Sequence, residues 1–252
     1  MLARRQFPPR AFEADQVRGG SPERNYLRVV VRLLAAHALA EKLTAQGYDR
    51  ALSRMGASAL APVIEKNMAE ERKHAAMIYR ALAELGVSET AADRSMISAL
   101  KGPSFEAPRY FAERASGELD LLMAGLSLDM TGLLMISENY GDSSYAPHSR
   151  AAALIVEEEA EHDQFAADEL RGAVERFGRD RAEQALREWV PRAANFFGPP
   201  GSGFTNDCLI YGLKRHDNQE LAGLYLEMLA RRVAQAGLDM PRLTPGYPRA
   251  LA

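Results

Sequence analysis

The sequence predicts an all-α fold: a bundle of four long helices with a dinuclear metal site in its core and extra helices toward the C-terminus. Apolar residues recur with a helical period of about 3.6 along several long segments, and no segment alternates as a strand would. A Glu-x2-His motif occurs at Glu71–His74 and again, 88 residues later, at Glu159–His162. An acid stands 30 residues before each copy, Glu41 and Asp129, so the chain repeats one pattern.

The length and composition fit one large globular domain. The 252 residues are 47% apolar and 26% charged, which is ordinary for a chain that buries a well-developed core. The formal net charge of −3 gives no broad basic surface of the kind that binds nucleic acid. Cys208 is the only cysteine, so an internal disulfide is excluded and we expect a small buried side chain there.

We expect three regions: an extended N-terminal arm at 1–20, the helical domain at 21–240 and a C-terminal tail at 241–252. The arm carries four arginines but lacks the apolar centre of a secretory signal. The longest apolar stretch, 29–40, is interrupted by two polar residues and is too short to span a bilayer. We therefore expect a cytoplasmic protein without a membrane segment.

The first long helix is predicted over residues 21–46. Ser21 suits an N-cap, Pro22 suits the first helical position, and Gly47 is expected to end the helix. The same periodicity, with Gly and Pro at the boundaries, predicts the other helices. These are expected at residues 57–85, 90–100 (a short helix inside a connection), 109–140, 147–177, 181–195, 207–214 and 218–236.

The third long helix offers two acids as the upstream partner of the second motif. Asp129 is the only charge in the apolar stripe of residues 109–140. Glu138 lies nine residues later, which is a rotation of about 900° and hence the opposite face of a regular helix. The shared spacing of 30 residues favours Asp129 over Glu138.

Four carboxylates and two imidazoles on four helices are the ligand set of a dinuclear metal site in a helix bundle. Such ligands, without thiolates, suit two iron ions, and manganese accepts the same set, whereas an iron–sulfur cluster or structural zinc would need cysteines. Glu71 and Glu159 are the expected bridges between the ions, with the other acids terminal. The predicted ligands are Glu41, Glu71, His74, Asp129, Glu159 and His162.

The remaining histidines and nearby acids could support the site. Glu70, Glu158 and Asp163 are candidate acceptors for the ligand imidazoles, although the sequence alone does not pair them. His37 lies one turn before Glu41, and two interpretations of it remain open: a hydrogen-bonded core histidine, or a group that faces the site. His148 and His216 are expected to be a helix-start residue and a surface turn residue.

The chain resembles the ferritin-like di-iron oxygenases of the phenylacetyl-CoA epoxidase (phenylacetic acid catabolic protein) family, and most of all their catalytic subunit. The resemblance covers about residues 25–240 and extends beyond the ligands to several short motifs. These are His37-Ala-Leu-Ala-Glu41, Ser144-Tyr-Ala-Pro147, Phe196-Phe-Gly-Pro199, Leu213-Lys-Arg215 with Asn218 to Leu221, and Gly237-Leu-Asp-Met-Pro241. The family's third carboxylate is an aspartate, which matches Asp129.

The resemblance implies a ferritin-like bundle with two iron ions on the six predicted ligands. It also implies a monooxygenase-type enzyme that activates dioxygen and inserts one oxygen atom, by epoxidation or hydroxylation, into a small organic substrate such as an acyl-CoA thioester. Electrons would come from a separate reductase, and the partners would be copies of the chain or a related ferritin-like subunit. The segment 85–120 departs from the family pattern and should help to shape the substrate pocket. The resemblance therefore supports the family's dioxygen chemistry for this chain more strongly than the family's substrate.

Three alternatives remain at this point. One is a di-iron hydroxylase acting on tRNA, for which the arginines of the N-terminal arm are the only argument. Another is a non-catalytic partner subunit, against which the complete ligand set counts. The last is a ferritin-like protein that handles iron or peroxide without an organic substrate.

Overall fold

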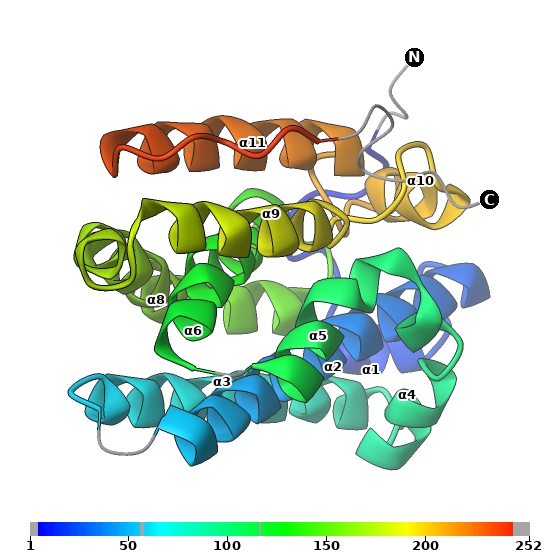
Figure 1. Cartoon of the computed structure of the whole chain (residues 1–252). Coiled ribbons are helices and arrows are strands. Elements are labelled where there is room, and N and C mark those ends of the chain that lie inside the picture. Colours follow the sequence, from blue (N-terminus) through cyan, green and yellow to red (C-terminus); the bar gives the residue numbers. More distant parts are fainter. Residues whose placement is uncertain (1–4, 56–57, 116, 244–252) are drawn as a thin grey trace.

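A computed structural model describes residues 5–55, 58–115 and 117–243, and within these ranges every regular element is a helix. Four long helical segments form the bundle: α2 (Arg24–Met55), α3 (Ala61–Glu84), the composite segment Glu118–Tyr140 and α8 (Ala146–Phe177). The helices α9 (Arg179–Ala194) and α11 (Asn218–Gln235) lie over them (Figure 1). The all-α bundle and its extra C-terminal helices are thereby confirmed.

The first pair of bundle helices shows how glycine permits close packing. The helices α2 and α3 lie side by side in the lower part of Figure 1, and α5 (Glu106–Arg114) packs across α2. Gly47 does not end α2, contrary to the prediction, because the helix continues for two more turns. A Cβ atom at this position would lie 2.2 Å from Cδ1 of Phe111, so the glycine is required by the helix crossing.

The N-terminal boundary of α2 also differs from the prediction. The helix begins at Arg24, and Ser21 and Pro22 precede it in an irregular segment. The preceding arm is not simply extended, because it contains the short helix α1 (Ala14–Arg18). The arm is docked on the domain: the amide of Phe12 donates to the Ser144 carbonyl at 3.0 Å, and Ala146 donates back to Phe12 at 2.9 Å.

The segment predicted as one helix over residues 109–140 is divided. Helix α5 ends at Arg114, and α6 (Glu118–Ala124) begins after Gly117. From there the chain continues as η3 (Gly125–Asp129), α7 (Met130–Leu134) and η4 (Met135–Tyr140), where η3 and η4 are π-helical. Single π-helical turns inside an α-helix are uncommon and occur often at functional sites.

The smaller elements lie mostly where glycine, proline and capping residues indicate. Between the two helix pairs run α4 (Glu89–Ser95) and the 3₁₀ turns η1 (Ala99–Lys101) and η2 (Pro103–Phe105). Gly178, with φ of 86°, follows the end of α8 as predicted. Helix α10 (Gly203–Ile210) begins four residues earlier than predicted, because the Ser202 hydroxyl caps it by accepting from the Thr205 amide.

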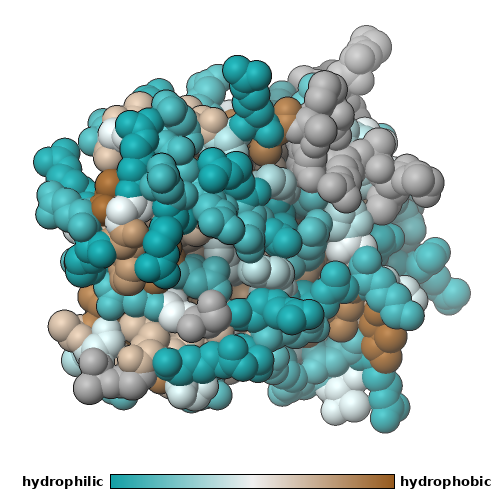
Figure 2. Space-filling model, viewed as in Figure 1, coloured by the Kyte–Doolittle hydropathy of each residue, from teal (hydrophilic) through white to brown (hydrophobic). Residues whose placement is uncertain are grey.

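The apolar side chains gather inside the bundle. The face shown in Figure 2 is largely hydrophilic, and the exposed large apolar residues are spread over separate elements. Residues 118–140 are long and apolar enough to cross a membrane by length and composition, but 78% of that window is buried, as in a core helix. Cys208 is buried as predicted. Leu238, which precedes the expected C-terminal tail at 241–252, is also buried.

Candidate metal centre

All six predicted ligands are buried, and they come from four different bundle segments. The acids Glu41 and Asp129 are 7% and 5% exposed, although an ionised carboxylate is costly to bury without a partner. The two motif histidines are essentially inaccessible. Helix α2 supplies Glu41, α3 supplies Glu71 and His74, η3 supplies Asp129, and α8 supplies Glu159 and His162.

Four of the six side chains lie closest together. One ligand atom from each of Glu41, Glu71, His74 and Glu159 lies within 4.8 Å of all the others. His162 is outside this group but approaches it, since its Nδ1 is 3.3 Å from Oε1 of Glu71. Asp129 is also outside the group and lines the same small cavity as the three glutamates. The structure therefore brings all six to one place, with two of them at its edge.

Each of the two motif histidines directs a free nitrogen toward a carboxylate of this cluster. The Nε2 atom of His74 lies 2.8 Å from Oε2 of Glu158, and donation along this contact leaves Nδ1 unprotonated in the neutral ring. That Nδ1 has no hydrogen-bond partner, although Oε1 of Glu159 lies 3.2 Å away. His162 has the same arrangement, with Nδ1 unpartnered. Two lone pairs facing each other inside a protein repel, whereas a metal cation between them would satisfy both, so the residues fit a metal centre.

The supporting hydrogen bonds cross between the two motifs. His74 on α3 pairs with Glu158 on α8, and Nε2 of His162 on α8 lies 2.9 Å from Oε2 of Glu70 on α3. Each acceptor is therefore the acid directly before the opposite motif's glutamate. Asp163, the third candidate acceptor, instead holds the Arg232 guanidinium through two hydrogen bonds.

Asp129 and Glu138, the two candidate acids of the third long helix, differ in burial. Oδ2 of Asp129 accepts a 2.8 Å hydrogen bond from the buried Tyr48 hydroxyl. The Glu138 side chain is 38% exposed and lies 3.7 Å from Nε2 of His216, away from the cluster. His216 is accordingly a partly exposed residue at a turn. The assignment of Asp129 as a metal ligand stays a prediction, and its burial next to the cluster supports it.

Two glycines of the composite helix leave room for the carboxylates. A Cβ atom on Gly132 would lie 3.0 Å from Oε2 of Glu159, and one on Gly125 would lie 3.2 Å from Oδ2 of Asp129. These distances are tighter than ordinary carbon–oxygen contacts, so a larger residue would displace the acid. The role of these glycines and the π-helical turns was not predicted, although two glycines seven residues apart on the ligand stripe were a visible signal.

The charges of the cluster are not balanced by the protein alone. Burial and the nearby charges of Glu159 and Glu41 raise the pKa of Glu71 well above its usual value. Burial, followed by the charge of Glu159, likewise raises the pKa of Asp129. Burial opposes the charged form of His74, but the carboxylates of Glu159 and Glu41 close to its Nδ1 raise its pKa to about 10. Without a metal the cluster therefore retains protons that a cation would replace.

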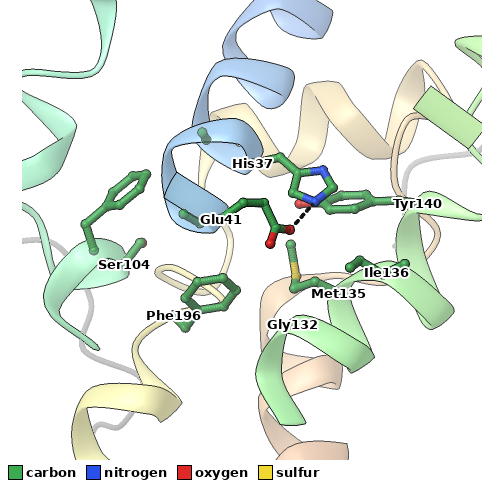
Figure 3. Close-up of a pocket in the computed structure, with 11 residues that line it drawn as sticks. His37, Glu41, Ser104, Gly132, Met135, Ile136, Tyr140 and Phe196 are labelled. Carbon is green, nitrogen blue, oxygen red and sulfur yellow. Dashed lines mark hydrogen bonds and ion pairs between the residues drawn. The ribbon is translucent and has the colours of Figure 1, made fainter. Parts of the chain in front are cut away.

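An apolar pocket adjoins the carboxylates. It lies against Glu41 and shares Ala40, Gly132 and Phe196 with the small cavity that the four acids line. Figure 3 shows Met135, Ile136 and Phe196 around the pocket, with His37 joined to Glu41. The Nε2 atom of His37 lies 2.7 Å from Oε1 of Glu41, and its Nδ1 lies 3.0 Å from Nε2 of His148.

The sequence interpretation of His148 was therefore incomplete. The residue does stand in the first turn of α8, but it is only 1% exposed and belongs to the hydrogen-bonded chain that ends on Glu41. Burial and the neighbouring His37 lower its pKa well below the usual value, so the ring is neutral. No pattern in the sequence connects two histidines 111 residues apart, and only the folded bundle shows their contact.

A comparison with known protein families gives a match over most of the chain. Residues 24–247 match the family model described as phenylacetic acid catabolic protein. No protein of curated function matches the chain. The matched region contains all six predicted ligands and the apolar pocket.

Proposed function

The chain belongs to the phenylacetic acid catabolic protein family, and from this membership and the buried cluster we propose that it is a di-iron oxygenase. The observation that carries the proposal is the pair of unpartnered histidine Nδ1 atoms facing buried carboxylates. Two iron ions bound by the six residues would supply the site where dioxygen is reduced, with one oxygen atom entering an organic substrate and the other leaving as water.

Each ligand would be held in place by a neighbouring side chain. Glu158 and Glu70 fix the orientation of the two imidazoles, and such supporting partners commonly change metal affinity by about 10–100-fold when altered. Tyr48 fixes Asp129, and His37 fixes Glu41. Glu71 and Glu159 each face the histidine of the opposite motif, so each would bind metal next to that histidine.

The organic substrate would enter the apolar pocket beside Glu41. Apolar walls exclude water from the reacting atoms and leave room for a small hydrocarbon group. An acyl-CoA thioester, whose acyl part alone would occupy the pocket, is one candidate within this class. Electrons would come from a separate reductase, and a second copy of the chain or a related ferritin-like subunit would be the structural partner.

A non-catalytic partner subunit is the alternative most directly addressed by the site. In such a subunit a lysine or arginine could neutralise the buried acids in place of metal. Among the residues that the structure describes, none of the four acids accepts a hydrogen bond from a lysine or arginine. Two of the acids are hydrogen-bonded to His37 and Tyr48, and the two motif histidines lie close to the cluster. This observation favours a metal-binding subunit.

The other two alternatives receive less support. A tRNA hydroxylase would use the arginines of the N-terminal arm, but Arg5 donates to the carbonyl of Gly212, and Arg10 donates to the Ser149 hydroxyl. A ferritin-like protein that only handles iron or peroxide has no need of an apolar pocket next to a ligand. The pocket beside Glu41 therefore favours an oxygenase with an organic substrate.

Isotope labelling tests the proposal. The iron-loaded chain is incubated with a chemical reductant, oxygen-18 gas and a panel of small carboxylic acids and their thioesters, and products are analysed by mass spectrometry. The proposal predicts a product that contains one labelled oxygen, formed by the wild type and by Glu138→Ala but not by Glu71→Ala. Release of labelled peroxide or water alone, with every organic compound unchanged, would support the iron- or peroxide-handling alternative instead.

A further inference from the structure

The hydroxyl group of Tyr140 is a polar feature of the pocket that neither the fold nor the metal cluster explains. Tyr140 is 5% exposed and lines the apolar pocket at the end of η4. None of the residues that the structure describes forms a hydrogen bond with its hydroxyl. Because the residue lines the pocket and its hydroxyl has no partner among the described residues, that hydroxyl is available to a molecule in the pocket.

The ring of Tyr140 is fixed by two histidines. Its centroid lies 4.9 Å from that of His37 and 4.5 Å from that of His148. Those histidines are themselves joined by a hydrogen bond and anchored on Glu41. Figure 3 shows the Tyr140 side chain beside His37, reaching toward Glu41. A phenol held in this way has little freedom to seek another partner, and its position is defined relative to the metal ligands.

The rest of the pocket offers mainly apolar contact. Met135, Ile136, Phe105 and Phe196 line it together with two alanines, so a hydrocarbon group fills most of the space. Burial and the charge of Glu41 both raise the pKa of Tyr140, so the phenol is neutral and acts as a donor. Small-molecule sites commonly combine such apolar walls with a few polar groups that fix orientation.

We propose that Tyr140 is a substrate-positioning residue that donates a hydrogen bond to an acceptor oxygen on a small, otherwise apolar substrate. The donor lies on the same side of the pocket as Glu41, so the substrate would be anchored close to the metal ligands with its apolar part against Met135 and Phe196. This inference rests on the proposed oxygenase function and narrows its substrate class to compounds that carry a carbonyl or comparable acceptor oxygen next to the hydrocarbon group.

A binding measurement separates this role from turnover. The full-length chain is titrated with para-fluoroacetophenone and with para-fluoroethylbenzene, which have similar shapes and differ at one position by a carbonyl oxygen. Fluorine NMR gives both dissociation constants without any reaction. We expect the wild type to bind the ketone roughly 5–10-fold more tightly, the range of one neutral hydrogen bond. Tyr140→Phe should remove that preference and leave hydrocarbon binding within about twofold.

Tyr225→Phe is the matched control, since Tyr225 is fully buried on α11 and does not line the pocket. It should retain the preference for the ketone. The proposal is wrong if the wild type binds neither compound, binds both alike, or if Tyr140→Phe keeps the preference. It is also wrong if Tyr140→Phe lowers the metal content while the ratio of the two dissociation constants stays at its wild-type value. The phenol would then act on the metal ligands and not on the bound compound. Elemental analysis of the same samples reports separately on the proposed metal centre.

Discussion

The Nε2 atom of His74 lies 2.8 Å from Oε2 of Glu158, an acid on the opposite helix of the bundle. The equivalent contact joins His162 and Glu70, so each motif orients the imidazole of the other. This crossed pairing accounts for two adjacent acids in each motif: the second is a predicted metal ligand and the first holds the opposite histidine. The repeat in the sequence thus corresponds to an approximate symmetry of the site.

Replacing Glu158 by glutamine should weaken metal binding. The amide keeps the shape of the side chain but removes the negative charge that polarises His74, and losses of about 10-fold or more are expected from such partners. Competition with a coloured chelator measures the affinity for Mn²⁺. Glu161→Gln is the control, because Glu161 is exposed and forms its ion pair with Lys66 and not with a motif histidine. Equal affinities for both variants and the wild type would contradict the supporting role of Glu158.

Replacing Gly132 by alanine should lower metal occupancy without unfolding the protein. The new methyl group would lie 3.0 Å from Oε2 of Glu159 and would push that carboxylate from its position. Gly223→Ala is the matched control: this glycine is helical, an added Cβ atom would meet nothing within 4 Å, and the change should stabilise the chain by up to about 1 kcal/mol. Metal analysis and thermal unfolding distinguish the two effects. Full metal occupancy in Gly132→Ala would show that this contact does not position Glu159.

Replacing Gly47 by alanine should destabilise the whole domain. The methyl group would overlap the Phe111 ring, and overpacking of this kind costs about 1–3 kcal/mol. Thermal unfolding should show a lower Tm by roughly 2–4 °C for each kcal/mol lost. Adding Phe111→Leu, which removes the ring atoms that clash, should recover part of that loss relative to Phe111→Leu alone. If Gly47→Ala unfolds at the wild-type temperature, the close crossing of α2 and α5 is not required.

The stabilisation of the protein by metal should increase with pH. Burial and neighbouring carboxylates raise the pKa of Glu71 in the folded chain, so the folded state binds more protons and the free energy of unfolding falls as pH rises above the unfolded value of about 4.3. The raised pKa of His74, about 10, acts in the same direction: its stabilising charge is complete below about 6.5 and is lost as pH rises toward 10.

A cation replaces these protons, so the increase in Tm on adding Mn²⁺ should be larger at about pH 8 than at about pH 6. Differential scanning calorimetry at both values, with and without metal, measures the effect. Glu71→Ala should show little metal-dependent increase at either pH, which controls for binding elsewhere. An increase in Tm on adding Mn²⁺ that is equal at both pH values, or larger at the lower one, would contradict the charge balance described for the cluster.

The sequence was sufficient to select the six buried residues and to predict the long helices, except that residues 109–140 form two helical segments and not one. Helical periodicity identifies a buried stripe regardless of what it packs against, and the repeated spacing distinguished Asp129, which is buried, from Glu138, which is partly exposed. The end of α2 was predicted wrongly because a glycine that ends a helix and a glycine that admits Phe111 look alike in sequence.

The parts that could not be predicted depend on contacts between distant segments. The π-helical turn that contains Asp129 and the close approach of Glu159 to Gly132 lie where the composite segment contacts α8, and no local pattern in the sequence encodes that contact. The contact of His148 with His37 and the free hydroxyl of Tyr140 likewise arise only when η4, α2 and α8 come together. The docking of the N-terminal arm on Ser144 could not be predicted either, because no helical or strand periodicity in the arm indicates it.

The metal stoichiometry of the purified chain tests the central claim most directly. Elemental analysis after anaerobic loading with Fe²⁺ and removal of excess metal gives the number of ions per chain. We expect two iron ions per chain, held by Glu41, Glu71, His74, Asp129, Glu159 and His162. A chain that retains no iron, or that retains its full iron content when Glu71 is replaced by alanine, would contradict the proposed centre.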